Sequence, residues 1–333
     1  MAFNNKENIE KLRNLVRQNL LPLINNNYVL LDVPNHRNIG DLLIWEGELE
    51  FLKESKYKLN YTSNVYTHLD SNIKKDDVIL LHGGGNFGDV WRLNQDFRNN
   101  IIKKFRKNRI IIFPQTIHYH NESFIKEDAA IFASHPDLVI CARDQVSYDF
   151  AKTHFSSSSI LMLPDMAFFL DFQSRHRFEK KNKSLILKRL DKELGSESQL
   201  TNVIRVMDEK ANKYEIKDWP GFIESGKLKR RIQYYFIKGE TVLSKFMVNK
   251  PILNLFVDDK HGLKGKNYKE KLIEKGVRFI NEYDTVYSTR LHGFILSVLL
   301  NKEVYIFDNS YGKNKNFFNT WLKDFEKVEL IES

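Results

Sequence analysis

The chain has 333 residues and a formal net charge of +9, and 42% of its residues are hydrophobic. This length exceeds the size at which one hydrophobic core usually stops growing, so it favours two domains. The apolar content excludes a disordered chain, and the longest apolar runs are far shorter than the roughly 20 residues that cross a bilayer. The single cysteine, Cys141, excludes a disulfide framework, and without a secretory signal at its start the sequence predicts a soluble cytoplasmic protein.

The first half of the chain alternates helical patterns with short apolar strands. Residues 6–25 have apolar side chains at helical spacing, and a second helix is expected over residues 42–54, with Asp41 as its N-cap. The expected strands are apolar throughout and are separated by helical segments, which is typical of a parallel sheet covered on both faces. These strands lie at residues 28–33, 77–81, 109–113, 138–141 and 160–163.

The composition changes near residue 172, because residues 173–184 are polar and basic, as in an interdomain linker. We therefore predict an N-terminal domain over residues 1–172 and a C-terminal domain over residues 173–333. Strands and helices alternate again in the second half, so both domains are expected to be α/β. The elements expected there are strands at 184–187, 285–288 and 304–307 and helices at 268–274 and 291–300, whereas residues 194–226 fit no clear pattern.

A glycine-rich segment, His82–Asp89 (HGGGNFGD), follows the strand at residues 77–81. Consecutive glycines let backbone amides approach an anion such as a phosphate, with Gly84, Gly85 and Asn86 as the candidate contacts. The segment also satisfies G-x-G-x-x-G, but a dinucleotide site needs an acidic residue at the end of the next strand, which here ends Phe113-Pro114-Gln115. The alternative is a tight turn that only packs a helix on a strand.

A second candidate site lies where the strand at residues 285–288 gives way to a helix. Arg290 and His292 occupy this junction, and ligands of open α/β sheets bind beyond the carboxyl ends of strands. An arginine there can hold a carboxylate or phosphate with two hydrogen bonds, and a histidine can act as general acid or base near neutral pH. The alternative is a histidine with a purely structural role.

A third candidate, Arg143-Asp144, follows the strand at residues 138–141. Arg143 is placed to bind an anion, and Asp144 is placed to cap the next helix. The alternative for Arg143 is a surface salt bridge.

Several separated segments resemble, in the same order, the motifs of the polysaccharide pyruvyl transferase family. The match spans roughly residues 30–310, but it is loose over 175–260, where we expect the acceptor to be selected. The principal segments are Asn38-Ile39-Gly40-Asp41, His82–Asp89, Pro114-Gln115-Thr116-Ile117 and Thr289-Arg290-Leu291-His292-Gly293. Ala142-Arg143-Asp144 with Ser147, and Leu163-Pro164-Asp165, resemble two further segments of the family.

The resemblance implies a glycosyltransferase-B-like fold, in which two Rossmann-like domains face a cleft. It also implies an enzyme that transfers pyruvate from phosphoenolpyruvate onto two hydroxyls of a sugar, as a cyclic ketal, in the biosynthesis of bacterial surface polysaccharides such as exopolysaccharide or capsule. By this resemblance, Arg143 and Arg290 bind the carboxylate and phosphate of the donor from opposite domains, and His292 is the general acid. The residues expected to bind the acceptor or support the site are Asn38, Asp41, His82, Gln115 and Asp165.

No cofactor is expected for this reaction, and the sequence has no metal-ligand motif such as H-E-x-x-H or paired cysteines. The positive charge is concentrated at residues 180–192 and 227–250, without a nucleic-acid-binding signature. A solvated surface is the simplest interpretation. The alternatives for residues 227–250 are capture of a sugar acceptor with an anionic anchor, lipid-linked or nucleotide-activated, and peripheral contact with the inner face of the membrane.

Two other functions remain open. The first is a glycosyltransferase of the same architecture that uses a nucleotide-activated sugar, because a fold does not fix a function. The second is a catalytically inactive homologue that binds a sugar or phosphate. The presence of Arg143, Arg290 and His292 argues against such a loss of activity.

Overall fold

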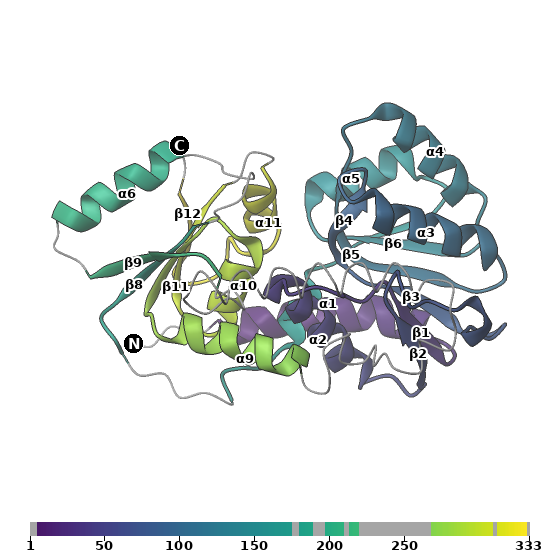
Figure 1. Cartoon of the computed structure of the whole chain (residues 1–333), viewed down its shortest axis with the longest axis horizontal. Coiled ribbons are helices and arrows are strands. Elements are labelled where there is room, and N and C mark those ends of the chain that lie inside the picture. Colours follow the sequence, from purple (N-terminus) through teal and green to yellow (C-terminus); the bar gives the residue numbers. More distant parts are fainter. Residues whose placement is uncertain are drawn as a thin grey trace, which may run out of the picture.

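The structure is a computed structural model that describes residues 5–174, 180–188, 197–209, 213–219, 268–308 and 312–331. Its strands form two β-sheets (Figure 1), and every strand pair within the described ranges is parallel. The larger sheet has the strand order β2-β1-β3-β5-β6-β7, with β4 also paired to β5, and the smaller has the order β12-β11-β10-β8-β9. The predicted α/β class with parallel sheets is confirmed.

The larger sheet is built entirely from residues before 173. Its strands are β1 (Tyr28–Leu31), β2 (Leu59–Ser63), β3 (Val78–Leu81), β4 (Gly84–Gly88), β5 (Ile110–His118), β6 (Leu138–Ala142) and β7 (Ser159–Met162). The α-helices of this half are α1 (Lys6–Leu20), α2 (Ile39–Leu52), α3 (Arg92–Lys104), α4 (Glu122–Ala133) and α5 (Gln145–His154). Short 3-10 helices lie at η1 (Leu21–Leu23), η2 (Asp70–Asn72) and η3 (Met166–Phe169).

The smaller sheet comes from residues after 183. Its strands are β8 (Ser184–Leu187), β9 (Tyr214–Lys217), β10 (Thr285–Ser288), β11 (Glu303–Phe307) and β12 (Val328–Ile331). The accompanying helices are α6 (Glu197–Glu209), α9 (Tyr268–Asn281), α10 (Leu291–Leu299) and α11 (Lys313–Trp321). The strands expected at 184–187 and 285–288 are confirmed. The division into two domains at residue 172, and the cleft between them, remain predictions.

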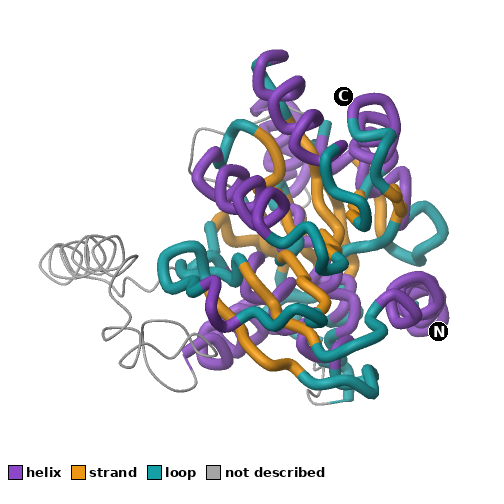
Figure 2. The backbone as a smooth tube through the Cα atoms, turned by 90° about the vertical axis from the view of Figure 1, so that its right-hand side faces the viewer, coloured by secondary structure: helices purple, strands orange, loops and turns teal. Residues whose placement is uncertain are grey.

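A continuous hydrophobic core joins the two sheets. One cluster of buried apolar side chains runs from Leu80 in β3 through Trp45 in α2 to Phe294 in α10 and Val304 in β11. Figure 1 shows the sheets at the two ends of the long axis, with α1, α2, α9 and α10 in the region between them. In the view turned by 90° (Figure 2), strands run through the middle and helices lie along the outside. The two sheets are thus joined by the helices that pack between them.

Two local predictions were wrong. Asn38, rather than Asp41, caps α2, because its Oδ1 accepts a hydrogen bond of 3.0 Å from the backbone N–H of Gly40. The glycine-rich segment is not a loop or tight turn: residues 84–88 form β4, which pairs with β5. Gly88 has a φ of 121°, and a Cβ there would meet the carbonyl oxygen of His118 at 1.8 Å, so this close pairing requires glycine.

Candidate active site

The central feature of the site is a buried ion pair between Arg143 and Asp165. Arg143 follows β6 and Asp165 follows β7, and the carboxyl ends of neighbouring parallel strands lie at the same edge of a sheet. Nη1 of Arg143 donates to Oδ2 of Asp165 at 2.7 Å, and Nε donates to Oγ1 of Thr116 at 2.9 Å. Because both charged side chains are at most 1% exposed, the alternative of a surface salt bridge for Arg143 is wrong.

The remaining nitrogen of Arg143, Nη2, is buried and has no hydrogen-bond partner among the described residues. It faces Gly85 of β4: a Cβ at that position would lie 3.2 Å from Nη2 and 2.9 Å from Nζ of Lys313, the first residue of α11. Leaving a buried donor unsatisfied is costly, so a group of this kind calls for an explanation, and a bound ion is one of them. The two cationic groups around a residue without a side chain form a place for an anion.

His292 reaches the same ion pair from the other sheet. It lies in the first turn of α10, and its Nε2 is 3.3 Å from Oδ2 of Asp165. Burial tends to raise the pKa of the Asp165 carboxyl, but the charges of His292 and Arg143 hold that pKa well below its usual range. Asp165 is therefore an ionised carboxylate that orients both the guanidinium and the imidazole.

The first turns of three helices meet at this point. A Cβ on Gly40, in the first turn of α2, would lie only 2.5 Å from Nδ1 of His292, so α2 and α10 begin against each other. Lys313 brings the start of α11 to Gly85. Helix N-termini carry partial positive charge and backbone N–H groups that point outward, so their convergence adds to the attraction for an anion.

Asp41 and Asn38 lie beside the glycine strand. Nδ2 of Asn38 donates to Oδ2 of Asp41 at 2.7 Å, and Oδ1 of Asp41 is 3.8 Å from the point that a Cβ on Gly84 would occupy. Burial acts to raise the pKa of Asp41, but the charges of His36 and His292 outweigh it and lower that pKa below its ordinary value. Asp41 is thus a carboxylate in its proton-accepting form next to His292.

His82 and Gln115 fix the start of the glycine-rich strand β4 through hydrogen bonds. Both oxygens of Glu48 in α2 are used here: one is 2.8 Å from Nδ1 of His82, and the other accepts the backbone N–H of Gly83 at 2.8 Å. Gln115 donates to the carbonyl of His82 at 2.7 Å and to Oδ1 of Asn86 at 3.1 Å. These bonds fix where β3 ends and β4 begins.

The side chain of Asn86 points into the protein. Its Oδ1 also accepts a hydrogen bond of 2.9 Å from Arg98, and its Nδ2 donates to Asp32 at 3.3 Å. The described bonds of this amide thus tie β4 to α3 and to Asp32, the residue that follows β1. The structure places the Asn86 side chain as an anchor of the strand, in contrast to the solvent-facing surroundings of Gly85.

Arg290, which follows β10, forms an ion pair with Asp218, which follows β9. Its Nε and Nη2 donate to the two oxygens of Asp218 at 2.5 Å and 2.7 Å. Arg143 lies at Asp165 and His292, so the two arginines have different carboxylate partners. Their joint clamping of a donor stays a prediction.

Sequence reasoning missed Lys313, Glu48 and Asp218. Lys313 had a usable signal, because it follows a strand and Gly312 and opens a helix, the same pattern that singled out Arg290. Glu48 had none, since a glutamate in the middle of an expected helix is usually solvated, and only the fold shows it to be fully buried. Asp218 lies in the stretch that fitted no pattern.

Within the described ranges, no group of three or more histidine, cysteine or acidic side chains is arranged to hold a metal ion. None of the helices in these ranges is long and apolar enough to cross a membrane. The basic segment Lys227–Lys250 lies outside the described residues.

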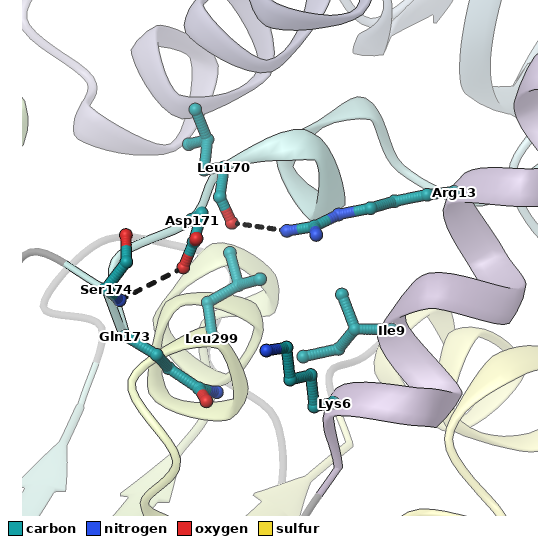
Figure 3. Close-up of a pocket in the computed structure, with 8 residues that line it drawn as sticks. All are labelled: Lys6, Ile9, Arg13, Leu170, Asp171, Gln173, Ser174 and Leu299. Carbon is teal, nitrogen blue, oxygen red and sulfur yellow. Dashed lines mark hydrogen bonds between the residues drawn. The ribbon is translucent and has the colours of Figure 1, made fainter.

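A separate cavity of about 210 Å³ lies between α1, residues 170–174 and the end of α10 (Figure 3). Arg13 donates to the carbonyl of Leu170 at 3.0 Å, and the backbone N–H of Ser174 donates to Asp171 at 3.2 Å. None of the predicted site residues lines it.

Comparison with known proteins gives a consistent result. A model of the polysaccharide pyruvyl transferase family matches residues 38–311. EpsO of Bacillus subtilis (strain 168), whose name assigns it provisionally to the pyruvyl transferases, is 33% identical over 309 residues, covering 91% of this chain and 88% of that protein. Pyruvyl transferase 1 of Schizosaccharomyces pombe (strain 972 / ATCC 24843) is 27% identical over 307 residues, covering 88% and 69% of the two chains.

A solved structure also matches along the whole length. It is a functionally uncharacterised protein of Klebsiella pneumoniae subsp. pneumoniae NTUH-K2044, with a TM-score of 0.60 and 20% identity, and the match covers 97% of this chain and 98% of that chain. At this identity the likeness concerns the fold alone.

Proposed function

The chain belongs to the polysaccharide pyruvyl transferase family, and on that premise we propose that it transfers pyruvate from phosphoenolpyruvate onto two hydroxyls of a sugar, forming a cyclic ketal. Membership of the family implies a transferase activity and a saccharide acceptor. The choice of phosphoenolpyruvate as donor, and the role of each residue, are the proposal. The two sheets then act as Rossmann-like halves of a glycosyltransferase-B-like enzyme, with the donor bound at their junction.

The observation that carries the proposal is the unsatisfied Nη2 of Arg143 beside Gly85 and Lys313. Phosphoenolpyruvate has a phosphate and a carboxylate, and both are good acceptors for guanidinium and ammonium donors. Glycine at position 85 lets these cations and the backbone of β4 approach the anion together. Arg290 is a third cation for the donor, which it would bind while keeping part of its pairing with Asp218.

His292 supplies the proton in this proposal. It protonates the methylene carbon of phosphoenolpyruvate, which makes the adjacent carbon electrophilic. One sugar hydroxyl adds to that carbon and gives its proton to the ionised Asp41, which lies beside His292. The second hydroxyl then adds as the carbon–oxygen bond to phosphate breaks, and its proton leaves with the phosphate. Asp165 holds the imidazole in place through the contact at Nε2.

A donor assay tests this assignment. We expect inorganic phosphate to be released from phosphoenolpyruvate in the presence of sugar acceptors, and no nucleotide to be released from sugar nucleotides. Calorimetry should show weaker binding of phosphoenolpyruvate to Arg143→Lys, which retains the charge but lacks Nη2. Release of nucleotide without use of phosphoenolpyruvate would replace the proposal with a glycosyltransferase. Binding of phosphoenolpyruvate to Arg143→Lys as tight as to the wild type would remove Arg143 from the donor site.

A further inference from the structure

An exposed apolar patch follows the glycine strand directly. Val90, Trp91 and Leu93 are 50%, 58% and 53% exposed. The other large apolar side chains that are exposed in the described ranges, Val146 and Ile216, stand on separate elements, α5 and β9. Single exposed apolar residues are ordinary, whereas three within four positions, with an indole among them, mark a place of interaction.

The patch is held rigidly by the residues around it. The carboxylate of Asp89 accepts the backbone N–H groups of His120 and Asn121, each at 2.8 Å. On the other side, Nδ2 of Asn94 donates to Asp32 at 2.7 Å, and the guanidinium of Arg92 lies 4.3 Å from the centre of the Phe124 ring. The start of α3 is thus fixed at several points. The residues on both sides of Trp91 are anchored by these contacts, so its side chain is exposed in a fixed position.

The patch is linked to the proposed donor site through strand β4. Gly85 of β4 lies against Arg143 and Lys313, and Gly88, at the other end of the same strand, pairs with His118 of β5. Three residues of extended chain span roughly 10 Å. The patch begins two residues beyond Gly88, so a ring held there belongs to a part of the acceptor beyond the sugar that receives the pyruvate.

The charges around the patch argue against an anionic membrane. Arg92 is paired with Asp128 at 2.8 Å, Asp96 at 2.7 Å and Glu127 at 3.5 Å. Asp96 and Glu127 are both exposed, so the positive charge of Arg92, which lies between Trp91 and Leu93, is outnumbered by its carboxylate partners. Anionic lipid surfaces attract clusters of lysine and arginine and repel such an excess of carboxylates. A neutral sugar meets no such barrier.

We propose that Trp91, flanked by Val90 and Leu93, is the platform on which a pyranose ring of the acceptor stacks. The proposal rests on the pyruvyl transferase function given above and assigns the acceptor side of that site. A pyranose has an apolar face of C–H groups that packs on an indole, and its hydroxyls lie at the ring edge. Trp91 therefore positions the acceptor and makes no contact with the donor.

The test compares Trp91→Ala, Trp91→Phe and the matched control Ile216→Ala, which removes a 48% exposed apolar side chain from the smaller sheet. The probes are methyl glycosides of glucose, galactose, mannose and N-acetylglucosamine, and binding is followed by tryptophan fluorescence and calorimetry in the presence of phosphoenolpyruvate. We expect at least one glycoside to bind the wild type and the control, Trp91→Ala to weaken it about tenfold or more, and Trp91→Phe to retain most of the affinity. Phosphoenolpyruvate alone should bind all four proteins equally.

Three results would overturn the platform. The first is a wild type that binds phosphoenolpyruvate yet responds to none of the glycosides. The second is a Trp91→Ala variant that binds them as tightly as the wild type does. Alternatively, the wild type could bind vesicles of phosphatidylcholine and phosphatidylglycerol in a manner that Trp91→Ala abolishes without any change in glycoside binding, which would assign the patch to a membrane. Failure of the wild type to bind phosphoenolpyruvate would instead contradict the proposed function, so the two failures are distinguishable.

Discussion

At the residue scale, the site depends on two glycines, which have no side chain, as well as on its charged side chains. Gly40 and Gly85 belong to two different motifs, and each leaves room for one functional group. A Cβ at residue 40 would meet the His292 ring, and a Cβ at residue 85 would meet Lys313 and Arg143. Neither glycine has a positive φ. Their role is therefore space, which makes alanine substitutions at these positions specific probes of the site.

Gly40→Ala should displace the His292 imidazole while leaving the donor site intact. The added methyl group would lie 2.5 Å from Nδ1, too close for the ring to stay in place. Displacement of a catalytic group by about 1 Å can cost on the order of a hundredfold in rate. We expect kcat to fall by that order, toward the value of His292→Ala, with phosphoenolpyruvate binding by calorimetry unchanged. Wild-type turnover in Gly40→Ala would show that the position of His292 does not matter.

Gly85→Ala should act on binding of the donor. Its methyl group would lie 2.9 Å from Nζ of Lys313 and 3.2 Å from Nη2 of Arg143, in the space assigned to the anion. The nearer contact is with the far end of the Lys313 side chain, which can shift, so the thermal midpoint should change little. We expect the Kd for phosphoenolpyruvate to rise about tenfold or more, equivalent to about 1.4 kcal/mol. An unaltered Kd in a correctly folded variant would place the donor elsewhere.

At the scale of elements, α2 organises the site. Its first turn packs on His292, Glu48 holds His82 and the start of the glycine segment, and Glu46 forms an ion pair with the buried Lys269 of α9. Nearly the whole of α2 is buried, which explains why its hydrophobic pattern gave its position but not its contacts. A helix buried on all sides shows no single apolar stripe.

Gly47→Ala should destabilise the protein, although alanine is the better helix former. A Cβ at residue 47 would meet the backbone oxygen of Met166 at 2.0 Å, so α2 and η3 would have to separate. Overpacking of this kind costs about 1–3 kcal/mol. Thermal unfolding should show a midpoint several degrees lower. The control is Gly276→Ala in α9, whose Cβ would meet side chains rather than backbone, the nearest being a methyl of Ile39 at 3.0 Å, and which should lower the midpoint less. Equal midpoints for the two variants would contradict the close packing of α2 on η3.

The His82–Glu48 pair predicts a pH dependence of stability. Burial acts to lower the pKa of His82, but the charge of Glu48 outweighs it and raises that pKa above its ordinary value. A raised histidine pKa contributes stability that is fully present below the unfolded pKa of about 6.5 and is lost as the pH rises through the folded value. The difference in thermal midpoint between the wild type and His82→Gln should therefore be larger at pH 6 than at pH 9. A difference that grows with pH would mean that His82 is neutral when folded.

At the scale of the whole molecule, the candidate site is made by contacts between residues far apart in sequence. Asp165 at the end of the larger sheet meets His292 from the smaller one, and Nε1 of Trp321 donates to the carbonyl of Arg143 at 2.7 Å. These contacts join residues of the half that contains the larger sheet to residues of the half that contains the smaller sheet. Opening of the two sheets relative to each other would therefore separate the groups assigned to the donor and the acid.

Much of this arrangement was predictable from sequence, and the remainder has physical reasons. The buried strands β3 and β6, and the strand-to-helix junctions at Arg143 and His292, follow from apolar runs that end in polar residues. The strand β2 was missed because only one of its residues, Ser63, is buried, so it lacks an apolar run. The capping role of Asn38 rather than Asp41, and the inward orientation of Asn86, depend on side-chain geometry that spacing does not encode.

The account's central claim is that phosphoenolpyruvate supplies a pyruvate ketal to a sugar at the junction of Arg143, Asp165 and His292. The most direct measurement is mass spectrometry of saccharide acceptors incubated with the protein and phosphoenolpyruvate, in parallel with His292→Ala. We predict a product heavier than its acceptor by one pyruvate minus one water, formed by the wild type and strongly reduced with the variant. An acceptor that gains a glycosyl unit from a nucleotide-activated sugar but no pyruvate from phosphoenolpyruvate, or equal product from His292→Ala, would contradict it.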